Sequence, residues 1–295
     1  MVLQYAAPSD SICLEVRGAD APAFLHGQLS QAVVELEPTH APLAGWADAR
    51  GRVRALVRVC RDPKRWLLVT PRDGAEDLLK KLRMFVLRAK VTLELAADVG
   101  VAALLGDADQ WLAARGVAVG TPASRLARRG ELTFIRVGPA FWQVLGTPAA
   151  LASLAAGLET ASDGASTLAE IRLGIPTITN TVADRFIAQM LNLDALGAVS
   201  FDKGCYPGQE IIARVHNLGG VKRRARRYAA EGAPPAVGTA VVAAGGEAGE
   251  VIRSAAAESG CELLAVVDHA AARVALTCGG ATLRELPLPF ALPTD

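Results

Sequence analysis

Residues 201–214 read FDKGCYPGQEIIAR, and this stretch decides most of what the sequence predicts. A glycine stands on each side of its Cys-Tyr-Pro tripeptide at 205–207, a composition typical of a tight, ordered loop. After Gly208 the apolar residues fall at helical spacing, so we expect a short helix that begins there and ends within 217–220. Glu210 lies in the first turn of that helix, where the helix dipole favours an acid.

Cys205 is the candidate nucleophile of this loop. It stands just before the expected helix N-terminus and two residues from Lys203, and both features favour the thiolate form of its side chain. A structural interpretation is open as well: Cys205 would be a small buried apolar residue, and the glycines would serve only the backbone geometry. The residues alone leave both interpretations standing.

Upstream of the loop, residues 48–51 read DARG and predict the turn of a β-hairpin. In the strand that follows, apolar residues alternate with Arg52, Arg54 and Arg58, so we expect these arginines to share one face. Periodicity also predicts strands around 12–17 and at 66–70, 91–95, 101–105, 133–137 and 141–145, with helices at 73–86, at 109–115 and between 147 and 157.

Downstream, Pro234-Pro235 marks a change in the character of the chain. Beyond it, short apolar runs alternate with Gly-rich turns, which predicts a small antiparallel barrel or sandwich. The expected strands are Thr239–Ala243, Gly249–Ile252, Leu263–Val267, Arg273–Leu276 and Ala281–Leu286.

The composition is that of a globular protein. The chain has 295 residues, 51% of them hydrophobic, and a net charge of +1, with a mean hydropathy of +0.28. The length suggests two or three domains, and the balanced charge exerts no overall attraction on nucleic acids or anionic membranes. The uncharged stretch between Arg136 and Glu159 is interrupted by glycines and prolines, so we interpret it as buried rather than membrane-spanning. No signal peptide is evident, and we expect a cytoplasmic protein without a membrane partner.

The cysteines and histidines do not indicate a metal site. None of the five cysteines forms a CxxC pair, and no Cys/His group has the spacing of a zinc or iron–sulfur ligand set. The odd cysteine count argues against a disulfide framework. A dinucleotide site is also not expected, because no GxGxxG motif follows a strand at the start of a helix.

A cluster of cations within 214–227 allows three interpretations. It could be a solvated strand face that leads into the barrel, or some arginines could bind carboxylates in a bidentate manner. Binding of nucleic acid needs interleaved aromatic residues, and only Tyr228 is near, so we do not expect it. The cluster consists of Arg214, Lys222, Arg223, Arg224, Arg226 and Arg227.

The octet KGCYPGQE at 203–210 resembles the K-G-C-Y-x-G-Q-E motif of the YgfZ-type folate-binding proteins, which are relatives of the glycine-cleavage T-protein, an aminomethyltransferase that uses tetrahydrofolate. The stretch 18–30, GADAPAFLHGQLS, resembles the early G-x-D-A-x-x-F-L-Q-G-Q-x-T of that family. The turn at 48–52 resembles its D-x-K-G-R turn, and 174–176 with 186–193 resembles the run before the octet. The order and spacing of these motifs hold over most of the chain.

The resemblance implies an α+β fold with three lobes in a cloverleaf around a central hole. Residues 1–221 would form two interleaved α+β lobes that bind folate, and 222–295 a small antiparallel β-barrel. Tetrahydrofolate or a polyglutamylated derivative would enter the hole with its glutamate tail outward. Cys205 becomes the candidate catalytic residue. Candidate folate-binding residues are Lys203, Gly204, Tyr206, Gly208, Gln209, Glu210, Arg52, Arg54, Arg172 and Arg214.

The chain also departs from the T-protein. Positions where the T-protein has its essential acid hold Arg54 and Ala55, and Arg172 replaces a folate-contacting glutamate. Aminomethyl transfer needs a carboxylate to handle the cationic amine. We therefore expect a folate-binding accessory protein that assists iron–sulfur enzymes or their assembly factors, including an enzyme that modifies tRNA. The alternatives are a folate-dependent aminomethyl- or methyltransferase and an RNA-binding or tRNA-modifying protein.

Overall fold

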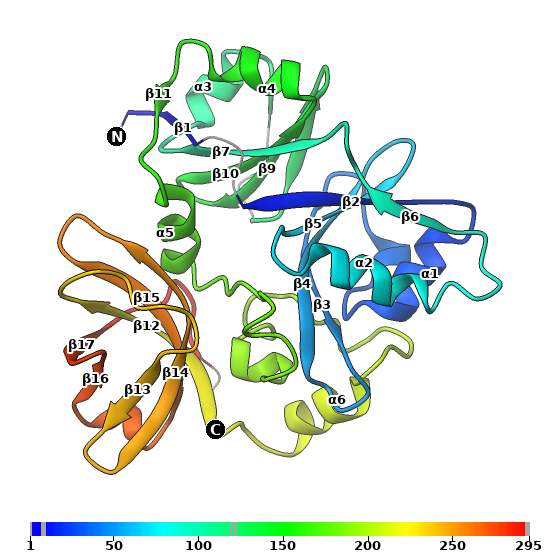
Figure 1. Cartoon of the computed structure of the whole chain (residues 1–295). Helices are drawn as coiled ribbons and strands as arrows, with labels where there is room; N and C mark the ends of the chain where they lie inside the picture. Colours follow the sequence, from blue (N-terminus) through cyan, green and yellow to red (C-terminus); the bar gives the residue numbers. More distant parts are fainter. Residues whose placement is uncertain (1, 7–9, 119, 121–122, 293–295) are drawn as a thin grey trace. The chain divides into compact units, whose positions relative to one another are not determined.

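The computed structural model describes residues 2–6, 10–118, 120 and 123–292. The chain divides into two compact units, each built from two separate stretches (Figure 1). Unit 1 contains residues 1–44 and 57–166, and unit 2 contains residues 45–56 and 167–295. Among the described residues, no helix has the length and apolar character needed to cross a membrane.

A six-stranded sheet lies in unit 1, in the order β11-β1-β7-β10-β9-β8. Only the β1–β11 pair is parallel. The predicted hairpin of 133–137 with 141–145 is confirmed as β9 and β10. The strands are β1 (Gln4–Ala6), β7 (Gly100–Leu105), β8 (Leu126–Arg129), β9 (Leu132–Gly138), β10 (Phe141–Gly146) and β11 (Glu159–Thr160), with helices α3 (Asp109–Ala113) and α4 (Pro148–Ala155).

A five-stranded sheet has the order β3-β4-β5-β2-β6, and its β3–β4 hairpin carries the chain into the 45–56 stretch of unit 2. Within unit 1, Cys13 and Leu67 of this sheet pack in one core with Ile135 and Leu145 of the other. The strands are β2 (Ser11–Arg17), β3 (Leu43–Ala47), β4 (Val53–Arg61), β5 (Trp66–Pro71) and β6 (Thr92–Leu95), with α1 (Ala21–Gln28), α2 (Ala75–Arg83) and the 3-10 turn η1 (Val33–Glu35).

One sequence prediction in this region needs correction. Helix α2 is shorter than the predicted 73–86, because Gly74 rather than Asp73 is the residue that precedes it and the chain turns away after Arg83. Of the arginines expected on one face of β4, Arg58 is buried, and its guanidinium donates to the carbonyl oxygen of Ala41 at 2.8 Å.

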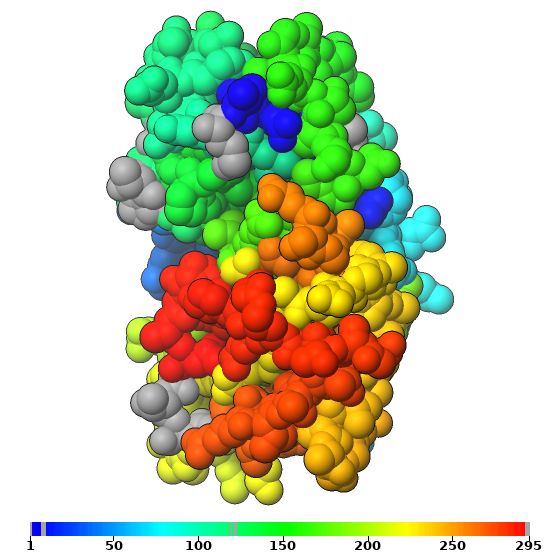
Figure 2. All heavy atoms as spheres, turned by 90° about the vertical axis from the view of Figure 1, so that its left-hand side faces the viewer, coloured from blue at the N-terminus to red at the C-terminus, as the bar shows by residue number. Residues whose placement is uncertain are grey.

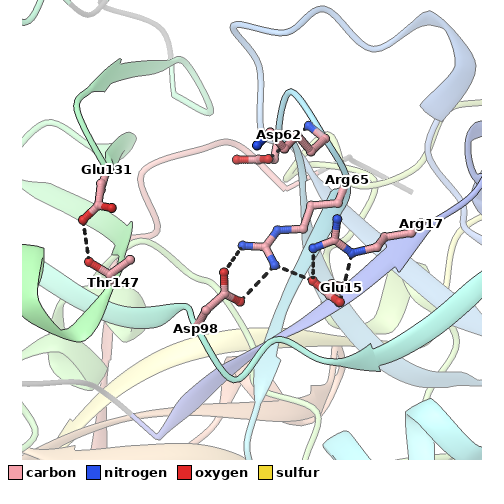
Figure 3. Close-up of polar contacts among 8 residues, drawn as sticks. Glu15, Arg17, Asp62, Arg65, Asp98, Glu131 and Thr147 are labelled. Atoms are coloured by element: carbon pink, nitrogen blue, oxygen red, sulfur yellow. Dashed lines mark hydrogen bonds and ion pairs between the residues drawn. The ribbon is translucent and has the colours of Figure 1, made fainter.

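An arginine of unit 1 binds two carboxylates from different segments (Figure 3). Arg65 donates to both oxygens of Asp98, at 2.9 and 2.7 Å, and also contacts Glu15 of β2. Glu15 in turn accepts two hydrogen bonds from Arg17. The guanidinium of Arg65 therefore ties β2 and the start of β5 to the segment between β6 and β7.

The last part of unit 2 is a closed antiparallel barrel, in the order β12-β15-β14-β13-β16-β17. Its strands are the yellow to red atoms of Figure 2. The barrel and its short antiparallel strands confirm the sequence prediction, except that 271–273 forms a 3-10 turn (η3, Ala271–Arg273) and the strand there starts at Leu276. The strands are β12 (Arg223–Ala230), β13 (Ala240–Ala243), β14 (Gly246–Ala256), β15 (Cys261–Asp268), β16 (Leu276–Cys278) and β17 (Ala281–Leu286).

Between α5 (Ala165–Arg172) and the barrel, the chain of unit 2 is mostly irregular. It contains the 3-10 turn η2 (Ala188–Leu191) and helix α6 (Gln209–Leu218), which is the helix predicted after Gly208. The α+β fold class and the barrel follow the sequence prediction. That 222–295 is a domain of its own stays a prediction.

Candidate functional site

The loop of the octet (Lys203–Glu210) ends at the first turn of α6. Gly208 precedes the helix in the left-handed conformation, with φ of 80°, and its carbonyl oxygen accepts from the backbone N–H of Ile212 at 3.2 Å. Gln209 closes the loop twice: its backbone N–H donates to the carbonyl of Tyr206, and its side-chain amide donates to the carbonyl of Lys203 at 3.3 Å. The loop is therefore ordered by its own residues.

The predicted turn at 48–51 is formed around one carboxylate. Oδ1 of Asp48 accepts from the backbone N–H groups of Arg50 and Arg52, both at 2.9 Å. The backbone carbonyl of Asp48 accepts from the N–H of Gly51, also at 2.9 Å. These bonds lie within five residues, so the turn needs no other segment to define its shape.

The octet and the 48–52 turn, far apart in sequence, are in direct contact inside unit 2. A Cβ on Gly208 would lie 2.5 Å from the carbonyl oxygen of Asp48 and 2.7 Å from Cα of Gly51. A Cβ on Gly51 would lie 3.1 Å from Cβ of Ile211. Only glycines permit this approach, and both have positive φ. The 48–52 turn therefore supports the backbone that carries Cys205.

The Cys205 side chain is exposed, as expected for a reactive residue, whereas the other four cysteines are buried. Lys203, two residues earlier, is only 7% exposed, and its Nζ lies 4.7 Å from the centroid of the Tyr206 ring. Burial lowers the pKa of Lys203 to about 8, against an opposing effect of Cys205, and burial raises the pKa of Tyr206 to about 12. The loop thus presents an exposed thiol beside a shielded amine.

Arg52 and Arg54 bind the segment 182–187 rather than standing free. Nη1 of Arg52 donates to the carbonyl oxygens of residues 184 and 185, both at 3.1 Å. Nε of Arg54 donates to Oδ1 of Asp184 at 2.7 Å, and both side chains of this pair remain partly exposed. The role of Arg52 and Arg54 as folate ligands stays a prediction. To bind a folate carboxylate, each guanidinium would have to keep its present partner as well or release it.

The other two candidate arginines lie on different elements. Arg172, at the end of α5, donates two hydrogen bonds to Glu262 of β15, which also pairs with Arg227 of β12. Arg214, on α6, is exposed and forms no hydrogen bond or ion pair with another described residue. Arg214 can therefore bind a carboxylate without losing an existing contact. Arg172, in contrast, already binds a carboxylate of the barrel.

A buried polar network beside the site was given no role by the sequence interpretation. The Gln189 amide donates to the carbonyl of Ile212 in α6 at 2.6 Å. Arg224 of β12 donates to the carbonyl of Gln189 and pairs with both oxygens of Asp194, at 3.0 Å each. The interpretation of the basic run as a solvated face is therefore wrong for Arg224, which is 3% exposed, whereas Lys222 and Arg223 are exposed. A signal was available: Gln189 and Asn192 interrupt an apolar run at 186–193, and Asp194 follows it directly.

The site offers a thiol, an amine and exposed guanidinium groups. Within the described ranges, no group of three or more His, Cys, Asp or Glu residues could hold a metal ion. A thiol and a neutral amine are nucleophiles, and guanidinium groups bind carboxylates.

No model of a protein family matches this chain. Among curated proteins, similar ones carry the name tRNA-modifying protein YgfZ. That of Sodalis glossinidius is 31% identical over 241 residues, which cover 78% of this chain and 72% of the relative. That of Vibrio atlanticus is 30% identical over 220 residues, covering 74% and 67%, and that of Colwellia psychrerythraea is 29% identical, covering 71% and 66%. The chain spans about two thirds of the length of these relatives.

Among solved structures, aminomethyltransferase T of the glycine cleavage system from Bartonella henselae is similar. It is 16% identical, with a TM-score of 0.78, and the match covers 98% of this chain and 86% of that one. At this identity the likeness concerns the fold alone. The fold is that of aminomethyltransferase T, as the sequence resemblance implied.

Proposed function

The chain belongs to the YgfZ family, and from that premise we propose that it binds a reduced folate and assists the assembly or maintenance of iron–sulfur enzymes, including one that modifies tRNA. The folate is tetrahydrofolate or a derivative, with or without a polyglutamate tail. The name of the curated relatives supports the link to tRNA modification. The family motifs, which resemble those of folate-binding proteins, support the folate, and the aminomethyltransferase T fold agrees with them by analogy of fold.

The observation that carries the proposal is the supported octet loop. The loop is held by its own hydrogen bonds and by the contact between Gly51 and Gly208, and it exposes the thiol of Cys205. An exposed thiol on an ordered loop supports a site for a ligand or client protein over a packing role, since a packing cysteine would be buried. Clients in this proposal are iron–sulfur enzymes or their assembly factors.

The arrangement of arginines favours an accessory protein over an aminomethyltransferase. Arg54 occupies a position where the T-protein resemblance requires an acid, and it holds the carboxylate of Asp184 in an ion pair. Arg172 occupies another such position and is bound to Glu262. Neither position supplies a free carboxylate to accept a proton from an amine.

Calorimetry with tetrahydrofolate and its pentaglutamate tests the binding step. We expect micromolar to millimolar affinity and a melting temperature that rises with ligand concentration by mass action. Arg214→Ala should weaken binding of the pentaglutamate more than binding of the monoglutamate, because Arg214 can bind tail carboxylates. Arg273→Ala, which removes an exposed arginine of the barrel, is the matched control. Absence of both heat and a thermal shift above about 1 mM ligand would contradict the proposal.

A deletion strain tests the biological step. Iron–sulfur enzyme activities and the tRNA modification should fall in the deletion strain and return with the wild-type gene. Unchanged activities of all assayed iron–sulfur enzymes would contradict the proposed assistance to these enzymes, whatever the calorimetry shows.

A further inference from the structure

The turn that joins α2 to β6 exposes three neighbouring apolar side chains. It leaves the end of α2 and returns to the start of β6 (Figure 1). Met84 is 63% exposed, Phe85 43% and Leu87 89%. Single apolar residues are common on protein surfaces, but a cluster of them rimmed by polar groups marks an interaction surface. These side chains, called the apolar tip below, therefore need an explanation outside the packing of the chain.

The backbone at the most exposed of these residues is strained. Leu87 has a positive φ of 42°, a left-handed conformation that a bulky side chain adopts only at a cost in energy and that asparagine adopts more readily. Residues held in such conformations cluster at functional positions. Neither packing nor backbone preference accounts for a leucine here, which is a second observation that points to a partner outside the chain.

The turn is held at both of its ends. On the helix side, the guanidinium of Arg83 donates to the carbonyl oxygen of Leu93 from Nε at 2.9 Å and from Nη2 at 2.6 Å. On the strand side, the backbone N–H of Lys90 donates to Oδ2 of Asp20 at 2.8 Å. The apolar tip is thus presented by a fixed backbone, and a surface that is already ordered loses less conformational entropy on binding.

Cations surround the apolar tip. Residues 80–90 read KKLRMFVLRAK and contain no acid. Of the cations in this stretch, only Lys81 forms an ion pair with another described residue, Asp77, at 2.6 Å. The net charge of +1 gives the whole chain no attraction to an anionic surface, so this local cluster has to supply any such attraction. The cations are Lys80, Lys81, Arg83, Arg88 and Lys90.

We propose that the turn at 80–90 docks the protein on an anionic membrane surface, with the apolar tip at the boundary between head groups and acyl chains and the cations on the lipid phosphates. The long stems of Lys and Arg let their charges stay at the head groups while the tip is buried. Such a contact needs no membrane-spanning helix. It departs from the sequence expectation of no membrane partner, which rested on overall charge, and it goes beyond the proposed function because it does not depend on folate.

Two other kinds of anionic partner fit the turn less well. A nucleic acid takes up cations through its phosphates and aromatic side chains through its bases, which leaves Met84 and Leu87 without a counterpart. A protein would need an acidic groove already shaped to receive the tip. A fluid lipid surface accounts for the apolar and the cationic side chains together and needs no matching shape.

Flotation of the full chain with lipid vesicles tests the proposal. Wild type should float with vesicles of equal parts phosphatidylglycerol and phosphatidylcholine, and not with phosphatidylcholine alone. Leu87→Asn should weaken the binding about tenfold, because the tip loses its most exposed apolar side chain. The same variant should keep or raise the melting temperature, since asparagine suits the left-handed backbone. A merely structural role of Leu87 would lower the melting temperature and leave binding unchanged.

Charge variants complete the test. Arg88→Gln and Lys90→Gln should each weaken binding about fivefold, the effect of one cation at an anionic membrane surface, and added salt should weaken it further. Val274→Asn and Arg273→Gln, which alter an exposed apolar residue and an exposed cation of the barrel, should bind as wild type does. Absence of flotation with the anionic vesicles would overturn the proposal. So would binding that survives Leu87→Asn and is lost only in the charge variants, because a nucleic acid or an acidic protein would then suit the turn equally well.

Discussion

Cys205 combines an exposed side chain with a backbone that is fixed on both sides. We predict that Cys205→Ser abolishes complementation of a deletion strain while the free energy of unfolding changes by less than about 0.5 kcal/mol, as is usual for an exposed position. Iron–sulfur enzyme activity in the strain and thermal melting of the purified variant are the two measurements.

Cys278→Ser provides the matched comparison. Its side chain lies in the barrel core, so a hydroxyl there should cost about 1–3 kcal/mol, because a buried polar group loses its hydrogen bonds to water. It should nevertheless complement the strain as long as the protein folds. Normal complementation by a stable Cys205→Ser protein would show that the thiol does no chemistry.

Gly208 is the residue through which the 48–52 turn supports the octet. Gly208→Ala should lower the free energy of unfolding by about 2–4 kcal/mol, for two reasons. The new Cβ would lie 2.5 Å from the carbonyl oxygen of Asp48, and alanine is strained in the left-handed conformation. Gly232→Ala has a comparable φ of 87° but nothing within 4 Å of the added Cβ, so it should cost only about 1 kcal/mol. Urea unfolding measures both, and equal losses would refute the role of the contact.

At the scale of elements, strand β12 is anchored by a single buried arginine. Arg224→Met should lower the free energy of unfolding by about 3–5 kcal/mol, because it leaves the Asp194 carboxylate, only 11% exposed, without its charged partner. Arg223→Met, one residue earlier, breaks an exposed pair with Asp268 and should cost at most about 1 kcal/mol. Chemical unfolding of the two variants checks the difference, and a loss confined to Arg223→Met would contradict it.

The Arg65 cluster makes part of the stability of unit 1 dependent on pH. Hydrogen bonds from Arg17 and Arg65 lower the pKa of Glu15, and that from Arg65 lowers the pKa of Asp98. A lowered folded-state pKa stabilises the fold above the unfolded pKa, and this stability is lost as pH falls through the folded value. Arg65→Met should thus cost about 1 kcal/mol at neutral pH, a small effect because Asp98 is largely exposed.

The difference in the free energy of unfolding between Arg65→Met and wild type should shrink toward zero as pH falls from about 5 to about 2. Lys64→Met, which removes the neighbouring exposed cation, should show no such pH dependence. Melting curves across this range make the comparison. A pH-independent loss in Arg65→Met would mean that packing of the arginine stem, rather than charge, holds the segments together.

Local patterns predicted most elements because alternation and turn residues act within a few positions. The strand at 281–286 and the helix after Gly208 are found where the sequence placed them. The role of Arg224 was missed, because a solvated face was one open interpretation of the six cations within 214–227 and the polar residues near 189–194 were not connected with them. Its burial depends on Asp194 and Gln189, which reach it only through tertiary folding.

At the scale of the whole molecule, the barrel and the fold class could be predicted, the first from patterning and the second from the family motifs. The contact of Gly51 with Gly208 could not be derived from spacing, because it joins stretches on opposite sides of the 57–166 stretch. Each motif on its own predicts a turn or a loop. Only the folded chain shows that the two are in contact.

The protein should not turn over the aminomethylated carrier protein of glycine cleavage. Arg54 and Ala55 stand in the acid positions, and the nearby Asp184 is neutralised by Arg54. Loss of a positioned acid or base lowers the reaction rate about 10²- to 10⁴-fold. An ammonia-release assay run beside a genuine T-protein measures such a difference. Turnover within about tenfold of that enzyme would refute this assignment of the arginines.

The Gly51–Gly208 contact also imposes an order in time. During synthesis at about 5–20 residues per second, the hairpin tip is complete roughly 10–30 s before the octet has been translated. Through that interval the surface against which Gly51 will pack does not yet exist. In the folded chain, the hydrogen bonds of Asp48 with other described residues reach no further along the sequence than Arg52. We therefore expect the Asp48 carboxylate to shape the 48–52 turn on the nascent chain before the octet arrives.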